Sequence, residues 1–198
     1  EKIIDPGGYF SVTSNDFHTT ITTNIFANLR VKDAVVDHMR KVANKRPSTG
    51  SSLTGAVVYL YWKYDEAEVF IDTTGDSLAR HGYRKIPGKA PMLEALAAAT
   101  ILSGKWDTTT PFINPMCGSG TLAIEAALIA SKRVPGLLRH NYAFMHVLGY
   151  DSAVYEKERA VIEHQITEPT GLQIIASDMS KQAIDIAKLN AAAAGVED

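Results

Sequence analysis

Residues 111–125 encode a strand, a glycine turn and a helix in direct succession, an order that brings backbone close to a ligand. The short apolar strand Phe112-Ile113 leads into a loop in which Gly118 and Gly120 permit a sharp turn and carry no Cβ to collide with a bound molecule. A helix is predicted to follow at Thr121, and its first amides attract a carboxylate. The alternative is a glycine turn that binds nothing.

A second signal places a carboxylate after the next predicted strand. Ile174-Ile175-Ala176 is followed by Ser177-Asp178 and by a helix from Ser180. Asp178 is therefore positioned to accept hydrogen bonds from two ribose hydroxyls, which indicates a nucleoside cofactor. Residues 118–123 formally fit the dinucleotide pattern G-x-G-x-x-A. In dinucleotide folds, however, the acid follows about 20 residues later, and Asp178 lies far beyond that, so the spacing disfavours NAD.

The loop Asn114-Pro115-Met116-Cys117-Gly118-Ser119-Gly120-Thr121 closely resembles the Asp-Pro-x-Cys-Gly-Ser-Gly-Thr loop of S-adenosylmethionine-dependent RNA methyltransferases. Two further stretches resemble the segment that precedes this loop in one family. They are Arg80-His81-Gly82-Tyr83-Arg84 and Lys89-Ala90-Pro91-Met92-Leu93-Glu94. This family comprises the THUMP-containing bacterial guanine-N2 methyltransferases of large-subunit ribosomal RNA, often labelled adenine-specific DNA methylases. Residues 29–37 and 72–78 are similar to its THUMP domain and the exit from it. The resemblance covers residues 24–198.

The resemblance implies S-adenosylmethionine as the cofactor. Gly118 and Gly120 would admit it, Asp178 would hold its ribose, and Met179 would pack beside its adenosine. The family usually has Asp where this chain has Asn114, which can bind the cofactor's ammonium but supplies no countercharge. The predicted cofactor-binding residues are Ala90, Pro91, Glu94, Asn114, Pro115, Met116, Cys117, Gly118, Ser119, Gly120, Thr121, Asp178 and Met179, of which Ala90, Pro91 and Glu94 would line the methionine end.

The resemblance nominates no catalytic residue on this chain. The family holds the flipped acceptor base with an Asn-Pro-Pro-aromatic motif, and no Asn-Pro-Pro occurs here. Asn114-Pro115-Met116 lacks the second proline, so it is not assigned that role. The sequence begins at Glu1 without a methionine, and we expect it to be a fragment truncated at both ends. Cys117 has no nearby base and is predicted to pack under the loop. The six histidines are scattered, and no metal site is predicted.

Composition narrows the choice of partners. The 198 residues are 45% hydrophobic and carry a formal charge of -2. The chain as a whole is therefore not basic, and any surface that binds nucleic acid must be a local basic patch. Two basic segments, 30–46 and 80–89, are candidates, although such runs are usually solvated faces. The predicted RNA-binding residues are Arg40, Lys41, Arg80, Arg84, Lys85 and Lys89. Structured RNA, in particular ribosomal RNA, is the expected partner, and no membrane or obligate protein partner is expected. The single cysteine favours a reducing, cytoplasmic location.

The predicted fold class is α/β: the first half of a Rossmann-like S-adenosylmethionine methyltransferase sheet, preceded by a partial α+β THUMP-like domain. The expected divisions are residues 1–75, a basic connector 76–89, and the methyltransferase part 90–198. The predicted elements are a strand at 9–13, helices at 31–43, 92–102, 121 onward, 152–165 and 180 onward, a hairpin of 57–64 with 68–72, and strands at 112–113 and 174–176. Residues 46–54 are predicted to be a loop, Pro91 to lie at or near the first turn of a helix, and Gly195 to end the last helix.

The sequence leaves three other functions open. An adenine-N6 DNA methyltransferase would use the same half-fold, although the THUMP-like part favours RNA. A nicotinamide oxidoreductase fits the glycine pattern but not the acid spacing. An RNA-binding module without catalysis is also compatible with these residues.

Overall fold

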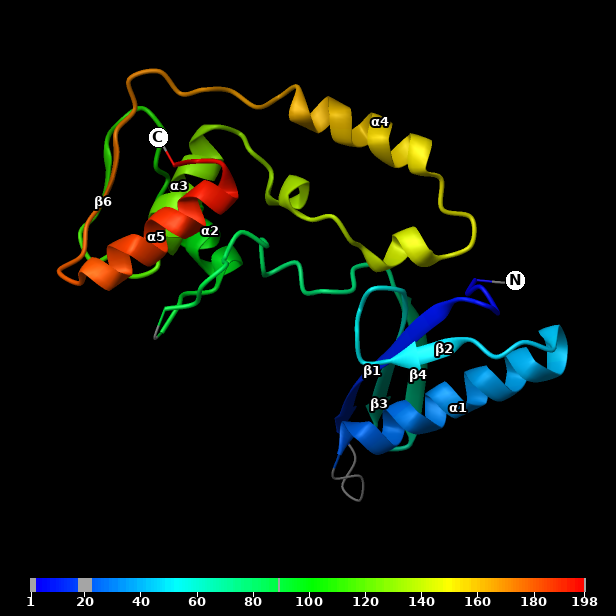
Figure 1. Cartoon of the computed structure of the whole chain (residues 1–198). Coiled ribbons are helices and arrows are strands. Elements are labelled where there is room, and N and C mark those ends of the chain that lie inside the picture. Colours follow the sequence, from blue (N-terminus) through cyan, green and yellow to red (C-terminus); the bar gives the residue numbers. More distant parts are fainter. Residues whose placement is uncertain (1–2, 18–22, 89, 198) are drawn as a thin grey trace. The chain divides into compact units, whose positions relative to one another are not determined.

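The computed structural model describes residues 3–17, 23–88 and 90–197, which divide into two compact units. The first unit consists of Glu1–Asp76 with Asn141–Ser152, and the second of Ser77–His140 with Ala153–Asp198. The chain therefore passes between the units after residues 76, 140 and 152 (Figure 1). Lys89, one of the predicted RNA-binding residues, lies outside the described residues.

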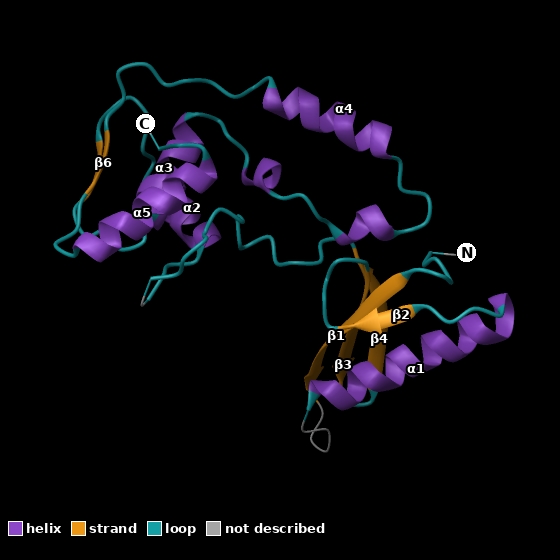
Figure 2. Ribbon diagram, viewed as in Figure 1, coloured by secondary structure: helices purple, strands orange, loops and turns teal. Residues whose placement is uncertain are grey.

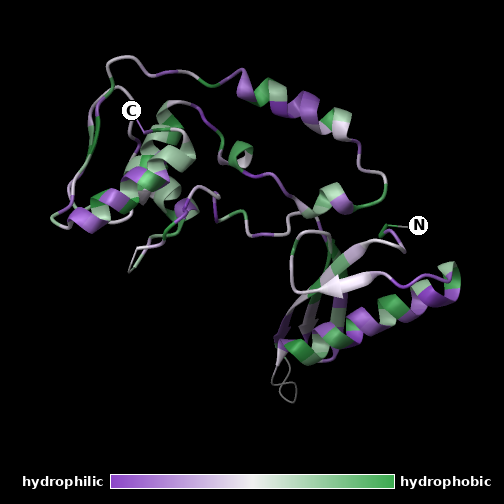
Figure 3. Cartoon of the chain, viewed as in Figure 1, coloured by the Kyte–Doolittle hydropathy of each residue, from purple (hydrophilic) through white to green (hydrophobic). Residues whose placement is uncertain are grey.

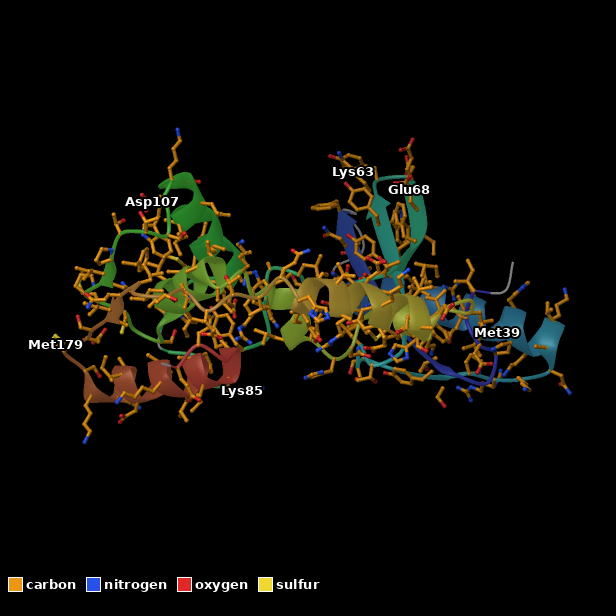
Figure 4. The ribbon with its side chains drawn as sticks, turned by 90° about the horizontal axis from the view of Figure 1, so that it is seen from above. Met39, Lys63, Glu68, Lys85, Asp107 and Met179 are labelled. Atoms are coloured by element: carbon orange, nitrogen blue, oxygen red, sulfur yellow. The ribbon has the colours of Figure 1, made fainter. Side chains whose placement is uncertain are left out.

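A four-stranded sheet and one long helix make up most of the first unit (Figure 2). The strands are β1 (Tyr9–Phe17), β2 (Ser48–Gly50), β3 (Ala56–Lys63) and β4 (Glu66–Asp72), in the spatial order β2-β1-β3-β4. β1 runs parallel to both of its neighbours, whereas β3 and β4 form an antiparallel hairpin. Lys63 and Glu68 lie near the tip of that hairpin (Figure 4).

Helix α1 (Asn24–Ala43) packs its apolar stripe against one face of this sheet. Phe10 is paired with Ala56, and Val12 with Val58, so these side chains share a face. The buried residues Phe10, Ala56 and Val58 form one cluster with Val36 of the helix, and Met39 packs against it. The exposed surface of the helix carries its charged residues together with the apolar Ile25, Phe26, Leu29 and Val42. The hydropathy colouring shows the two kinds of residue alternating along α1 (Figure 3).

The structure corrects two predictions in this unit. The helix begins at Asn24 rather than at residue 31, because the buried Ala27 extends the apolar stripe by a turn. Residues 46–54 are not only a loop, since β2 forms within them. Its Ser-Thr-Gly sequence gives no apolar signal, and the strand exists because its backbone pairs with Tyr9 to Ser11. The predicted hairpin and the first strand are confirmed.

A segment from residues 132–171, a stretch that we call the insert, completes the first unit. The 3-10 turn η2 (Ala143–His146) contacts β3, and the amide of Phe144 donates to the carbonyl of Thr73 at 3.0 Å. The amide of Leu148 likewise donates to Ile3, and the side chain of Asn141 donates to Leu53. Residues 141–152 therefore close the end of the sheet where β3 begins and β4 ends.

The second unit places three helices beside a pair of parallel strands (Figures 1 and 2). The helices are α2 (Glu94–Ser103), α3 (Thr121–Ala130) and α5 (Lys181–Ala194), with α3 in contact with the other two. The strands β5 (Phe112–Asn114) and β6 (Ile174–Ala176) pair in register. Helix α3 is apolar almost all round (Figure 3), which agrees with its burial. The insert adds the 3-10 turn η1 (Pro135–Leu138) and α4 (Ser152–Glu163).

The strand-loop-helix order predicted for the second unit is confirmed, with small shifts at the ends of elements. Helix α2 begins at Glu94, so Pro91 lies just before the helix, near its first turn as predicted. Gly195 ends α5 with a left-handed backbone, φ 70°, as expected of a C-cap glycine. Among the described residues, no helix has the length and apolarity needed to cross a membrane.

We expect Ala143→Arg to destabilise the first unit, because Ala143 is completely buried and its Cβ lies 3.5 Å from the position a Cβ on Gly75 would take. Overpacking together with burial of a charge should cost about 3 kcal/mol or more. Hydrogen exchange should then accelerate at the amides of β1 and β3. Ala160→Arg, on the exposed side of α4, is the control. Unchanged protection of β1 and β3 would show that the segment 141–152 is peripheral to this unit.

Candidate functional site

Two loops meet at the carboxyl ends of β5 and β6, the edge where parallel α/β sheets bind ligands. The strand pairing continues beyond the strands, since the Ser177 amide donates to the Asn114 carbonyl at 3.0 Å and the Cys117 amide to the Ser177 carbonyl at 2.9 Å. The two loops are therefore held side by side by backbone hydrogen bonds. The structure thus brings together the two sequence signals, the glycine loop and Asp178.

Asp178 joins these loops through its carboxylate. Its Oδ1 accepts from the Ser180 amide at 2.9 Å, and its Oδ2 accepts from the Gly118 amide at 3.0 Å. These amide hydrogen bonds, that of Ser180 foremost, lower the pKa of Asp178 below its ordinary value. Asp178 is therefore an anion at neutral pH. A carboxylate has about four acceptor positions, so two further donors can still bind.

The two loop glycines have different roles. Gly118 has a φ of 54°, and nothing lies within 4 Å of the position a Cβ would take, so the space beside it is open. Gly120 has a φ of 83°, and a Cβ there would lie 3.0 Å from the Cβ of Ala187. Gly120 thus permits close packing of the loop on α5. The open space lies beside Gly118, and the expectation that both glycines admit a ligand stays a prediction.

The other loop residues divide by exposure. Cys117 is buried, and burial together with the charge of Asp178 raises the pKa of its thiol. A protonated buried thiol fits the packing role predicted for it. Met116 and Met179 project into solvent, and Met179 stands clear of the ribbon just before α5 (Figure 4). Ala90, Pro91 and Pro115 are also exposed. The expectation that Met179 packs beside an adenosine stays a prediction.

Glu94 and Arg84 form a buried ion pair behind the loop. The Arg84 Nε lies 3.6 Å from the Glu94 Oε1, and the same guanidinium donates to Thr121 Oγ1 at 3.0 Å and to the Met92 carbonyl. Only 14% of the Arg84 side chain is exposed. This corrects the assignment of Arg84 to RNA binding, because its guanidinium is enclosed by protein groups and joins α2 to the start of α3.

Two buried acceptors of this site have no hydrogen-bond partner among the described residues. They are the second oxygen of Glu94, Oε2, and the side-chain oxygen of Asn114, Oδ1. A buried acceptor without a donor costs free energy. Both residues were predicted from the sequence to face the amino-acid end of a cofactor. A ligand ammonium has the donors that these two oxygens lack, so the residues present fit such a group.

A second buried carboxylate, Glu125 of α3, was missed by the sequence analysis. It is 1% exposed, and its Oε1 accepts from the Tyr83 hydroxyl at 2.8 Å and lies 2.7 Å from His81 Nδ1. Burial, followed by the charge of Glu125, raises the pKa of Tyr83 far above its ordinary value, so that the hydroxyl remains a donor. The sequence does carry a signal for this residue, because Glu125 is the single charged residue in the otherwise uncharged helix α3. The described residues hold no cluster of three or more groups suited to a metal ion.

The remaining basic residues predicted to bind RNA lie at the surface of their own units. Arg40 and Lys41 occupy the last turn of α1. A guanidinium nitrogen of Arg40, Nη1, lies 3.8 Å from Oδ1 of Asp37. Arg80 and Lys85 belong to the second unit, and their side chains are exposed. Lys85 lies close to α5, since its backbone amide donates to Asn190 (Figure 4). These four residues are accessible to phosphate, and their contact with RNA stays a prediction.

Comparison with known proteins identifies the family to which this fold and pair of loops belong. Residues 81–198 match the family UPF0020, described as RMKL-like, methyltransferase domain. The chain belongs to this family.

Solved structures of similar proteins cover both units. SMU.472, assigned as a methyltransferase and crystallised with SAH, is 30% identical with a TM-score of 0.78 over 97% of this chain. A protein from Listeria monocytogenes str. 4b F2365, described as a predicted N6-adenine-specific DNA methylase, is 32% identical with a TM-score of 0.79 over 98%. A possible methylase from Clostridium difficile 630 is 30% identical with a TM-score of 0.80 over 98%. The chain spans about half of each, 51%.

We expect Glu125→Ala to lower the free energy of unfolding of the second unit by on the order of 2–4 kcal/mol, because it leaves the buried Tyr83 hydroxyl and the partly buried His81 without their acceptor. Glu125→Gln should cost less, since the amide oxygen can still accept one of these hydrogen bonds. Denaturant unfolding compares both variants with Glu156→Ala, an exposed position on α4. Equal stability of all three variants would contradict a structural role for Glu125.

Proposed function

We propose that the protein containing this chain transfers a methyl group from S-adenosylmethionine to RNA, at guanine N2 of large-subunit ribosomal RNA. The observation that carries the cofactor assignment is the pair of loops joined by Asp178 and the Gly118 amide at the ends of two parallel strands. The SAH found with SMU.472 supports the same cofactor. A relative that carries SAH and a family of methyltransferases both disfavour the nicotinamide alternative.

The cofactor-binding roles follow from the described contacts. The acceptor positions left on Asp178 would hold the ribose hydroxyls, and the open space beside Gly118 would let the cofactor approach the backbone. The start of α3, at Thr121, would place backbone amides near the methionine carboxylate. When bound, the cofactor supplies a methyl group on a sulfonium for in-line displacement. The residues of this chain bind and orient it and exclude water.

Glu94 supplies the charge that Asn114 lacks. The neutral Asn114 cannot balance the charge of the cofactor's ammonium. Glu94 is a buried carboxylate whose ion pair with Arg84 uses Oε1 and leaves Oε2 without a partner. In the proposed complex Glu94 and Asn114 both accept from the ammonium, and Glu94 provides the negative charge. A charge-assisted hydrogen bond is stronger than a neutral one, so the bond to Glu94 is the stronger of the two in this proposal.

RNA is the proposed substrate because of the first unit. It presents the basic end of α1, with Arg40 and Lys41 exposed, and its sequence resembles a THUMP domain. The choice of guanine N2 rests on the same resemblance. The second candidate is an adenine-N6 DNA methyltransferase, which the description of the Listeria monocytogenes relative favours. An RNA-binding module without catalysis would bind RNA and the cofactor but transfer no methyl group.

We expect Asp178→Ala to weaken binding of S-adenosylhomocysteine at least tenfold, because the variant loses hydrogen bonds to a carboxylate and frees the glycine loop from β6. Isothermal calorimetry on the intact protein measures the affinity. Asp185→Ala, an exposed change on α5, is the matched control and should bind like the wild type. Unchanged affinity of Asp178→Ala would remove Asp178 from the site. Binding of NADH in place of S-adenosylhomocysteine would overturn the cofactor assignment.

We expect charge reversal at the exposed basic residues, Arg40→Glu with Lys41→Glu, or Arg80→Glu, to weaken binding of structured RNA and flatten its dependence on salt. For every phosphate that the variant no longer neutralises, the salt slope should fall by about 0.7–0.9. Affinity for S-adenosylhomocysteine should stay within about twofold. Arg84 is left unchanged because it belongs to the cofactor site.

Filter binding over a range of salt concentrations measures these slopes. Lys157→Glu, on the exposed side of α4, serves as the control. If the slopes of the reversed variants equal that of the wild type, the RNA path runs elsewhere on the protein. Tighter binding of duplex DNA than of RNA would favour the adenine-N6 alternative.

A further inference from the structure

Residues 81–88 form a strap that lies across the glycine loop and the start of α3. Arg84 reaches Thr121, Tyr83 and His81 reach Glu125, and Gly88 approaches the loop so closely that a Cβ there would lie 3.6 Å from the Cβ of Ser119. The strap leads directly to residues 90–94, the segment expected to line the methionine end of the cofactor. Its position therefore limits where that segment and the glycine loop can lie.

Asn190 of α5 ties the strap to the loop. It is 0% exposed. Its Oδ1 accepts from the amides of Lys85 at 2.9 Å and Ile86 at 3.4 Å, and its Nδ2 donates to the carbonyls of Ile86 at 3.3 Å and Ser119 at 3.1 Å. A primary amide offers two donors and two acceptor lone pairs. All four are used, so this one side chain joins three segments that are far apart in the sequence.

The hydrogen bond to Ser119 constrains the backbone of the cofactor loop. Because a trans peptide is planar, fixing the Ser119 carbonyl also fixes the direction of the Gly120 amide, which donates to the Cys117 carbonyl at 2.8 Å. The Gly118 peptide is held on its other side by Asp178. Both ends of the Gly118-Ser119-Gly120 turn are then anchored. Asp178 holds the Gly118 end from the ligand side, and Asn190 holds the Ser119-Gly120 peptide from the other side.

Packing alone does not require an amide at this position. Gly120 already packs on Ala187, and the buried Ala194 of α5 clusters with Ile124 and Leu128 of α3. What an apolar side chain of the same size could not do is bond to the Lys85 and Ile86 amides and to the Ser119 carbonyl, which hold the strap and the loop in place. We propose that Asn190 is a positioning residue for cofactor binding, which fixes the glycine loop and the strap in the arrangement that S-adenosylmethionine requires. The proposal rests on the cofactor assignment made above.

The test changes the donors of Asn190 and keeps its shape. In Asn190→Asp the two acceptor positions for Lys85 and Ile86 remain, but the carboxylate faces the carbonyls of Ser119 and Ile86 with no donor. We expect the affinity for S-adenosylhomocysteine, measured by calorimetry on the intact protein, to fall at least tenfold. In turnover the KM for S-adenosylmethionine should rise by a similar factor, with kcat and RNA affinity within about twofold. Gln182→Glu makes the same amide-to-acid change at an exposed position of α5 and should behave as the wild type.

A purely structural role predicts a different result. Loss of folding would lower the fraction of active protein, and with it the apparent kcat, but leave the KM for S-adenosylmethionine unchanged. Should Asn190→Asp fail to fold, Asn190→Ser gives the same test with one short donor, and we expect an intermediate loss of affinity. Wild-type affinity in a folded variant at this position would overturn the proposal. Failure of the wild type itself to bind S-adenosylhomocysteine would instead refute the cofactor assignment.

Discussion

The hydrogen bond from the Gly118 amide to the Asp178 carboxylate is the constraint around which the second unit is arranged. It forms only if β5 and β6 pair in parallel and in register, because only that pairing brings the two strand ends together. It also requires Gly118 to adopt a left-handed backbone, which a residue with a Cβ rarely adopts. This hydrogen bond therefore depends on the sheet register, on the glycine and on the acid together.

Buried polar side chains hold this arrangement from behind. Glu94, Glu125 and Asn190 are all buried, and each lies on a different helix. Their partners lie on the 81–88 strap or on the glycine loop. Because a buried polar group is costly unless its partners are in place, such a network tolerates one geometry and penalises others. The rigid support lies behind the loop, while the side chains of Met116 and Met179 around its mouth remain exposed.

The sequence predicted those parts of the fold and of the site that depend on local chemistry. The glycine turn, the acid after the second strand and the β3-β4 hairpin were found because each carries its own pattern of residue types. The strand β2 was not, since it is held by pairing rather than by apolar residues. Arg84 was misassigned for a related reason. It belongs to a run of basic residues, which predicts a charged surface, whereas the burial of Arg84 against Glu94 depends on the position of the helix that follows. Glu125 and Asn190 were missed because their partners lie about 40 and 105 residues away.

The discontinuous make-up of the first unit has a consequence for biosynthesis. Its sheet and helix are complete once residue 76 has been made, but the segment that closes the sheet comes only with residues 141–152. At about 5–20 residues per second, translation of the intervening stretch takes several seconds. During that interval the sheet lacks the segment whose Asn141 and Phe144 donate hydrogen bonds to Leu53 and Thr73, while the first part of the second unit is being made. The folding of the two units is thus interleaved in time.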